Sequence, residues 1–240
     1  KTYNNLGFLY ISLNDYSVAI DNFKKSLEIE IKHGDRFMES KILSNISGCY
    51  IGQSQPEIAR DYLLRSIRIK EKLEENKSLA FSYAQLGNSY KVDKNYPEAI
   101  QNYRKALGKF NEEKVELQCG KVLLMMSEAY LEMNEKEEAL DYLQRARNIC
   151  INFNESILLG MIDYIDARIL VCKNQFNEAI KQFNSSINYF QFAESRSYIC
   201  HALFELCITK IYTRDIDTLQ ADIIKFKNIS RKYKDYFNEL

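Results

Sequence analysis

The sequence repeats with a period of about 40 residues, and this period constrains the fold more than any other feature. Units of this length cannot bury an apolar face alone, so the repeat predicts a stack of similar helix pairs. Close packing within each pair requires small side chains at fixed positions. One such column contains Gly7, Ser47, Gly87, Ser127, Ala167 and Cys207. A second contains Ala19, Ala59, Ala99, Ala139, Ala179 and, departing from the rule, Leu219.

The composition favours helices in every unit. Among 240 residues there are 8 glycines and 2 prolines, too few for a turn-rich β protein. The chain has 33 basic and 33 acidic side chains, so no net field draws it toward nucleic acid or an anionic membrane. We therefore expect an all-α protein with no direct nucleic-acid partner and no membrane partner.

Larger side chains form two further columns. The first contains Tyr10, Tyr50, Tyr90, Tyr130, Leu170 and Lys210. The second contains Phe23, Leu63, Tyr103, Leu143, Phe183 and Ile223. With the small columns they resemble the tetratricopeptide repeat (TPR) signature W-x2-L-G-x2-Y…A-x3-F. The variety that fits is the longer-period form found in kinesin light chain and in bacterial Rap-type and PlcR-type regulators.

Three features depart from the usual TPR pattern: the period is longer than the common value of about 34, the Trp is replaced, and the terminal Pro is missing. HEAT and armadillo repeats have a similarly long period but do not place Gly, Tyr and Ala in these columns. The resemblance implies a single right-handed superhelical solenoid over residues 1–240. Its six units are expected near residues 1–35, 36–75, 76–114, 115–154, 155–194 and 195–240.

Helix boundaries follow from the columns and from local signals. Helices are expected to begin near residues 1, 16, 36, 55, 77, 96, 115, 135, 155, 175, 195 and 215. Ser54 and Asn134 each precede a helix with a glutamate three residues later, which predicts capping boxes. The apolar stripe from Ile216 to Phe237 predicts a long last helix that either caps the solenoid or connects to a further domain. Because the chain begins at Lys1 inside a helical pattern, we expect a fragment of a longer protein.

Catalytic and metal-binding patterns are missing from the sequence. It contains no phosphate loop, no HExxH, no GxSxG and no kinase signature, so we expect no enzyme activity and no cofactor. The six cysteines and two histidines do not have the spacing of a zinc site, so we expect no metal. Free thiols, the lack of a long apolar run and the lack of a signal peptide favour a cytoplasmic location.

The TPR resemblance implies that the first helix of each unit lines a concave groove. Carboxamides there can donate to and accept from a peptide backbone, cations can pair with carboxylates, and aromatic rings can form pockets. The candidate groove residues are Asn5, Lys41, Asn45, Phe81, Gln85, Asn88, Lys91, Lys121, Glu128, Tyr164 and Arg168. Further groove positions are Asn4, Phe8, Ser44, Leu124, Met125, Phe204 and Glu205.

Three functions remain open on the sequence. The leading one is a non-enzymatic sensor or scaffold module that binds a protein or peptide segment within a larger bacterial signalling protein. The second is a peptide-pheromone-responsive regulator of the Rap or PlcR type, which only the sequence before Lys1 would decide. The third is a homo-oligomerisation platform that pairs through its terminal repeats, which a monomer in light scattering would exclude.

Overall fold

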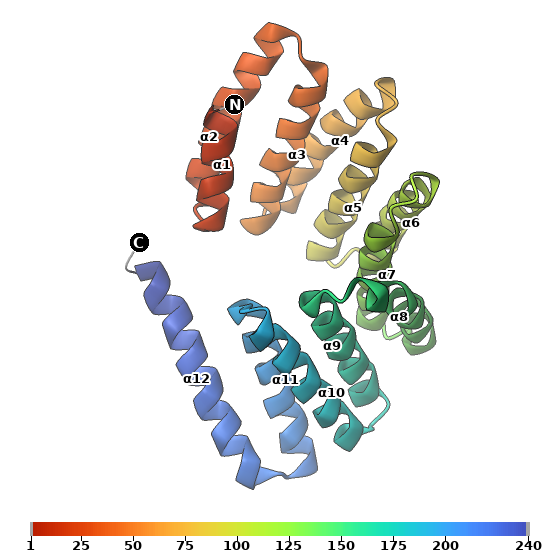
Figure 1. The fold of residues 1–240 in the computed structure, drawn as a ribbon, viewed down its shortest axis with the longest axis vertical. Helices are drawn as coiled ribbons and strands as arrows, with labels where there is room; N and C mark the ends of the chain where they lie inside the picture. The colour runs from red at the N-terminus through yellow and green to blue at the C-terminus, as the bar shows by residue number, and fades with distance from the viewer. Residues whose placement is uncertain (1, 239–240) are drawn as a thin grey trace. The chain divides into compact units, whose positions relative to one another are not determined.

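The computed structural model describes residues 2–238, and it describes their side chains except at 217 and 232–238. This part of the chain contains twelve α-helices, one short 3-10 helix and no strand (Figure 1). The predicted all-α class and the six helix pairs are confirmed. The helices are α1 (Thr2–Ser12), α2 (Tyr16–His33), α3 (Arg36–Gly52), α4 (Pro56–Lys72), α5 (Asn76–Val92), α6 (Tyr96–Glu112), α7 (Glu116–Glu132), α8 (Lys136–Cys150), α9 (Ser156–Cys172), α10 (Phe176–Phe192), α11 (Arg196–Thr213) and α12 (Ile216–Asn238).

The chain packs as two compact units, residues 1–122 and 123–240. In the first unit, each helix from α1 to α6 packs against the next, and α3 also contacts α5. In the second unit, α8 to α12 pack in sequence in the same way. Each predicted helix start lies within one residue of an observed start, because the apolar columns locate each helix independently.

The helices are linked by turns of one type that recurs at a constant interval along the chain. One residue in each turn has a left-handed backbone, and these residues are Asn14, Gly34, Ser54, Glu74, Lys94, Lys114, Asn134, Asn154, Asn174, Glu194 and Arg214. At most of these turns, the next N–H donates back to a carbonyl five residues earlier, as from Asn95 to Tyr90 at 2.9 Å. This is the Schellman ending, which usually uses glycine. From α2 to α11, each helix with its turn therefore has the same length, and two of them make one repeat of the sequence.

These turns contradict the two predicted capping boxes. Ser54 and Asn134 end the preceding helix in the left-handed conformation, with φ of 57° and 62°. The N-cap positions of the following helices belong to Gln55 and Glu135, and neither side chain makes a capping hydrogen bond. The prediction was wrong because Ser and Asn favour both helix starts and left-handed turns, and the sequence alone does not separate the two uses.

Asp35 is a true N-cap. Its Oδ1 accepts the backbone N–H of Met38 at 2.9 Å. We expect Asp35→Ala to lower the free energy of unfolding by about 1 kcal/mol, because one N–H at the start of α3 loses its acceptor. Urea denaturation measures this. Asn95→Ala is the matched control, because Asn95 occupies the N-cap of α6 without a side-chain hydrogen bond. Equal losses for the two variants would contradict the assigned cap.

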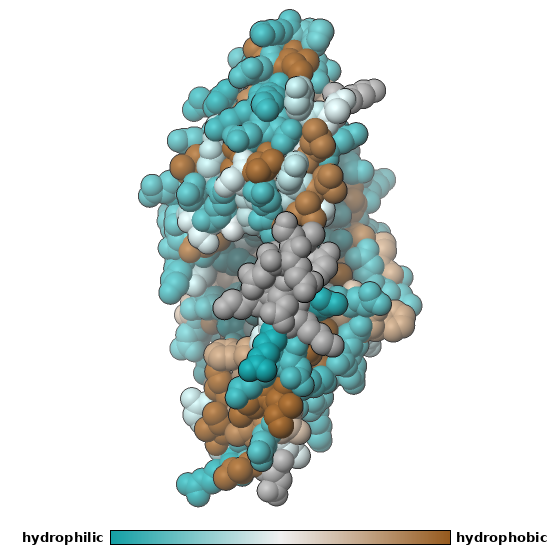
Figure 2. Space-filling view, turned by 90° about the vertical axis from the view of Figure 1, so that its left-hand side faces the viewer, coloured by the Kyte–Doolittle hydropathy of each residue, from teal (hydrophilic) through white to brown (hydrophobic). Residues whose placement is uncertain are grey.

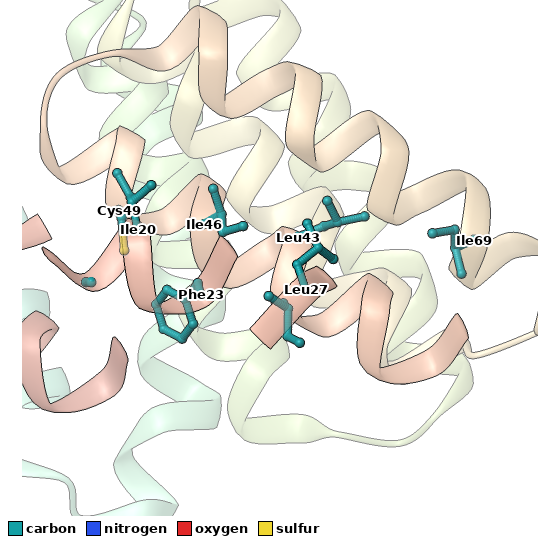
Figure 3. Close-up of a cluster of buried hydrophobic side chains, with 9 residues drawn as sticks. Ile20, Phe23, Leu27, Leu43, Ile46, Cys49 and Ile69 are labelled. Atoms are coloured by element: carbon teal, nitrogen blue, oxygen red, sulfur yellow. The ribbon is translucent and has the colours of Figure 1, made fainter. Parts of the chain in front are cut away.

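The core of the first unit is built from the repeat columns. Figure 3 shows one cluster in which Phe23 and Leu27 of α2 lie against Leu43 and Ile46 of α3. Gly7 lies under Phe23 and Gly87 under Tyr103, so closely that a Cβ would come within 2.5 Å of either ring. At these two positions, the column predicted to be small holds glycine beneath an aromatic ring. All five alanines of the second column, in both units, are 0% exposed: Ala19, Ala59, Ala99, Ala139 and Ala179.

The second unit has its own cluster around Phe183, Phe190 and Leu203. Helix α12 packs on this cluster through Phe226 and Ile229. The remaining predicted stripe is partly exposed, with Ile216 at 72%, and Figure 2 shows apolar surface at α12. Tyr233 and Phe237 of the stripe lie outside the described side chains. Helix α12 thus covers the end of the second core, as either predicted role for it requires.

No helix in the described part of the chain is long and apolar enough to span a bilayer. The six cysteines are free thiols, three of them buried, and burial raises the pKa of Cys49 to about 11. Over the same described residues, no three His, Cys, Asp or Glu side chains gather where they could hold a metal ion.

Candidate functional site: a pocket in the first unit

The first unit contains a pocket of about 420 Å³. Its lining comes from α1, α3 and α5, the first helices of three successive pairs, with one residue from α4. The lining residues are Asn4, Phe8, Met38, Lys41, Ser44, Asn45, Lys70, Ser78, Phe81 and Gln85. The pocket therefore lies on the helices that the TPR resemblance assigns to the groove.

The structure brings four of the principal candidate residues together in this pocket: Lys41, Asn45, Phe81 and Gln85. Asn4, Phe8 and Ser44, also predicted as groove positions, join them. Asn5 is exposed and does not line the pocket. Asn88 lies outside the lining as well, and its Oδ1 accepts the hydroxyl of Tyr103 at 2.7 Å. That oxygen is already engaged within its own helix pair.

Carboxamides and aromatic rings occupy fixed places around the pocket. Asn45 Nδ2 donates to Asn4 Oδ1 at 3.4 Å, which links α3 to α1. The rings of Phe8 and Phe81 are 49% and 41% exposed. Each packs edge-to-face on a core ring, with the Phe81 and Phe110 centroids 4.9 Å apart. Two half-exposed rings thus flank the amides and offer apolar contact surface to a ligand.

Gln85 supplies an unsatisfied acceptor. Its Oε1 is buried and has no hydrogen-bond partner, the one such side-chain atom found among the described residues. A buried carbonyl oxygen without a donor costs about 1–3 kcal/mol. An N–H donor from a bound molecule would remove that cost. This atom is therefore the point in the pocket where a peptide backbone N–H gains most.

Lys70 reaches the pocket from α4 and is held by serine hydroxyls. Its Nζ donates to Ser44 Oγ at 2.9 Å and to Ser82 Oγ at 2.6 Å. Ser44 Oγ lies 2.9 Å from Ser66 Oγ, which itself donates to the carbonyl of Ser40 at 2.6 Å. The hydroxyl hydrogen of Ser66 is used on the carbonyl of Ser40. In the contact between Ser44 and Ser66 the donor is therefore the hydroxyl of Ser44, whose oxygen accepts from Lys70. The network fixes the position of the ammonium group.

The environment of Lys70 disfavours its charge. Burial, and second the charge of Lys41, lower the pKa of Lys70 to about 8. The ammonium is nevertheless the main form at neutral pH. The pocket therefore contains two lysines, of which one is buried and one lies over the ring of Phe37.

Sequence reasoning missed Lys70, Met38 and Ser78. Met38 and Ser78 lie in the first turns of α3 and α5, before the positions that the resemblance assigned to the groove. Lys70 was missed because second helices were assigned to scaffold packing alone. A signal existed: in later repeats, the same column holds Phe110 and Phe190, both 1% exposed. The same column also holds Glu30, Cys150 and Ser230, so the lysine was only a weak signal in the sequence.

The candidate residues of the second unit are arranged differently. Arg168 Nη2 donates to Glu132 Oε1 at 2.6 Å, and its guanidinium lies 5.7 Å from the ring centroid of Tyr164. Burial raises the pKa of Tyr164 to about 12. Arg168 already has a carboxylate partner, so a ligand carboxylate would have to compete with Glu132. The other candidates on α5 and α7, which are Lys91, Lys121 and Glu128, are each partly buried and outside the lining of the pocket.

Paired helices that pack in sequence, with small columns between them, define a helical repeat protein. A family model described as "Tetratricopeptide repeat" matches residues 1–72 and 78–152, more than half of the chain. The chain belongs to the tetratricopeptide repeat family. No curated protein sequence matches it.

Solved structures share the fold at low sequence identity. The apo form of RapI has a TM-score of 0.81 and is 14% identical, over 97% of this chain and 83% of that one. A Rap protein complexed with Competence and Sporulation Factor has a TM-score of 0.77 and is 14% identical, over 98% of this chain and 64% of that one. NprR in complex with its cognate peptide NprX has a TM-score of 0.75 and is 17% identical, over 99% of this chain and 68% of that one. These likenesses establish the fold.

Proposed function

We propose that this chain is a non-enzymatic module that binds an extended peptide segment in the pocket formed by α1, α3 and α5. The observation that carries the proposal is the buried, unpaired Oε1 of Gln85 inside a pocket that also presents Asn4, Asn45, Phe8 and Phe81. Amides can bind a peptide backbone through both donor and acceptor atoms. The two exposed rings can hold its apolar side chains.

The similar structures support this proposal at the level of fold. Two of them are described as complexes, one with Competence and Sporulation Factor and one with a cognate peptide. On this basis the finer role we propose is a sensor or scaffold module of a larger signalling protein. A peptide-responsive regulator similar to Rap or NprR is the second candidate, favoured by the TM-score of 0.81 to RapI.

The absence of enzyme activity is part of the proposal. The pocket contains amides, serines, lysines and rings but no carboxylate, histidine or cysteine side chain. An acid–base pair of the usual kind is therefore not assembled in it. Binding accounts for these residues without a chemical step.

Binding of random hexapeptides, measured by fluorescence polarisation, tests the proposal. We expect Gln85→Met to weaken the selected peptides about tenfold, because a backbone N–H loses its acceptor. The free energy of unfolding should rise by about 1–3 kcal/mol, because the substitution removes a buried acceptor that has no partner in the free protein.

Asn184→Ala is the matched control. Asn184 is an exposed amide on α10, and its Nδ2 donates to the carbonyl of Ile180 within its own helix. We expect this variant to bind the selected peptides as the native protein does. If Gln85→Met and Asn45→Ala bind them equally well too, the pocket is not the site.

A further inference from the structure

The first unit contains another cavity, separate from the pocket of α1, α3 and α5. It has a volume of about 220 Å³ and lies where α3 begins and α4 ends. The two cavities have no lining residue in common. The residues that line this one, which we call the cationic cavity, are Arg36, Glu39, Arg65, Arg68, Ile69 and Lys72. Four cationic side chains thus meet one carboxylate, in a chain whose formal net charge is zero.

Three of the cations come from one face of α4. Arg65, Arg68 and Lys72 are spaced by three and four residues, which makes them neighbours on the helix surface. All three are exposed, and no Asp or Glu oxygen among the described residues lies within 4.0 Å of their side-chain nitrogens. Like charges at this spacing are unfavourable for a helix. The stability of α4 therefore gives no reason for the cluster.

Glu39 is a buried carboxylate that orients the fourth cation. It is 5% exposed, whereas in other repeats the same column holds Leu79, Cys119 and Ile199, all buried. Arg36 Nη1 donates to Glu39 Oε2 at 2.6 Å. A guanidinium group has five N–H donors, so the remaining donors of Arg36 stay available at the cavity. In this repeat an apolar packing position is replaced by a group that fixes an arginine.

The corresponding place in the next repeat lacks this arrangement. A cavity of about 420 Å³ there is lined in part by Asn76 and Leu79. These residues occupy the columns of Arg36 and Glu39. The charged residues of its lining are Glu71, Glu74 and Lys109. The fold therefore forms similar cavities in two successive repeats, and of these two the earlier one alone has an excess of cations.

We propose that the cationic cavity binds a phosphate group of a small molecule, with Arg36, Arg65 and Arg68 as its recognition residues. A planar guanidinium group can donate two parallel hydrogen bonds to phosphate oxygens. A phosphate group carries about two negative charges near pH 7 and has three acceptor oxygens, so it can accept from several cations at once. A carboxylate has one charge and two oxygens, which a single arginine can satisfy. The number of converging cations therefore favours phosphate.

The size of the cationic cavity restricts the ligand further. Its volume of about 220 Å³ is below the range of about 300–1,000 Å³ that is usual for drug-sized ligands. We therefore expect a small anion such as diphosphate to fill it. This inference concerns a site that the proposed peptide pocket does not include.

Isothermal titration calorimetry of the native chain with diphosphate, orthophosphate and acetate, at constant ionic strength, tests the proposal. We expect diphosphate to bind at least about tenfold more tightly than acetate, because it accepts from several cations and acetate from one. Orthophosphate that binds as tightly as diphosphate would show that one phosphate group fills the site. Acetate that binds as tightly as diphosphate would overturn the assignment to phosphate.

Arg65→Gln should weaken the binding of diphosphate by about tenfold or more, because a charged donor is lost. Arg145→Gln is the matched control and should bind diphosphate as the native chain does. Arg145 occupies the same column two repeats later, is exposed, and lies over a tyrosine ring as Arg65 does, but it is not part of the cavity. Thermal unfolding followed by circular dichroism checks that both variants are folded.

Equal affinity of the native chain and both variants for diphosphate would overturn the site. So would the lack of detectable binding of diphosphate and orthophosphate by the native chain. Because the two cavities share no lining residue, either result would leave the peptide-binding proposal standing.

Discussion

Replacing Gly87 with alanine is expected to lower the free energy of unfolding by about 2–4 kcal/mol. A Cβ at Gly87 would lie 2.4 Å from Cε1 and 2.5 Å from Cδ1 of Tyr103, and 3.0 Å from the carbonyl oxygen of Ala99. Tyr103 is 0% exposed, so its ring cannot move into solvent. Moving the ring also strains the hydrogen bond from its hydroxyl to Asn88 Oδ1. Urea denaturation followed by circular dichroism measures the loss.

Gly108→Ala is the matched control, because Gly108 also lies inside a helix but has nothing within 4 Å of an added Cβ. There the substitution should stabilise the protein by about 0.5–1 kcal/mol, since alanine loses less backbone entropy than glycine in a helix. A similar stabilisation at Gly87 would mean that α5 and α6 are not as closely packed as described.

Lys70→Met is expected to stabilise the protein at pH 7 by about 2–3 kcal/mol. The shift of the pKa of Lys70 from 10.5 to about 8 corresponds to about 3 kcal/mol of cost for keeping the ammonium buried. Methionine has a similar length and no charge. Ser44 and Ser82, 3.2 Å apart, can then pair with each other.

The sign of the pH dependence follows from the direction of the shift. Between pH 8 and pH 10.5 the unfolded chain binds more protons at Lys70 than the folded chain does, so native stability gains from rising pH in that window. The advantage of Lys70→Met should therefore shrink above pH 8 and approach the neutral packing difference near pH 10.5. Comparing the two proteins at each pH cancels the opposing effect of Tyr83, whose raised pKa lowers stability in more alkaline solution. An advantage that stays constant with pH would contradict the buried ammonium.

The fold was largely predictable because the same pattern of small and large residues at the helix contacts recurs in the six repeats. A column such as Ala19 to Ala179 identifies the contact between two helices even where single residues depart from the pattern. The turns were less predictable. Gly34 and the asparagines Asn14, Asn134, Asn154 and Asn174 are residue types that favour the left-handed conformation. Glu74 and Lys94 adopt the same conformation with side chains that give no such signal.

The site was predictable where the repeat governs it and hidden where it does not. The TPR resemblance implied that Asn45, Phe81 and Gln85 lie on the groove, and the structure places all three in the lining of the pocket. Lys70 is on a second helix, and its long side chain reaches the pocket from behind the first helices through the serine network. The spacing of columns specifies where a backbone lies, but it does not specify how far a flexible side chain reaches.

The even spacing of the left-handed turn residues determines which insertions and deletions keep the packing columns in register. Since these turn residues are evenly spaced, with one after each helix from α1 to α11, the loss of a single helix and its turn would convert every later first helix into a second one. Positions that hold small side chains would then pack against the wrong partners, and residues that line the pocket would point into the core. The loss or gain of a complete helix pair restores every column to its place. Lineages of such chains should accordingly differ in length by whole helix pairs.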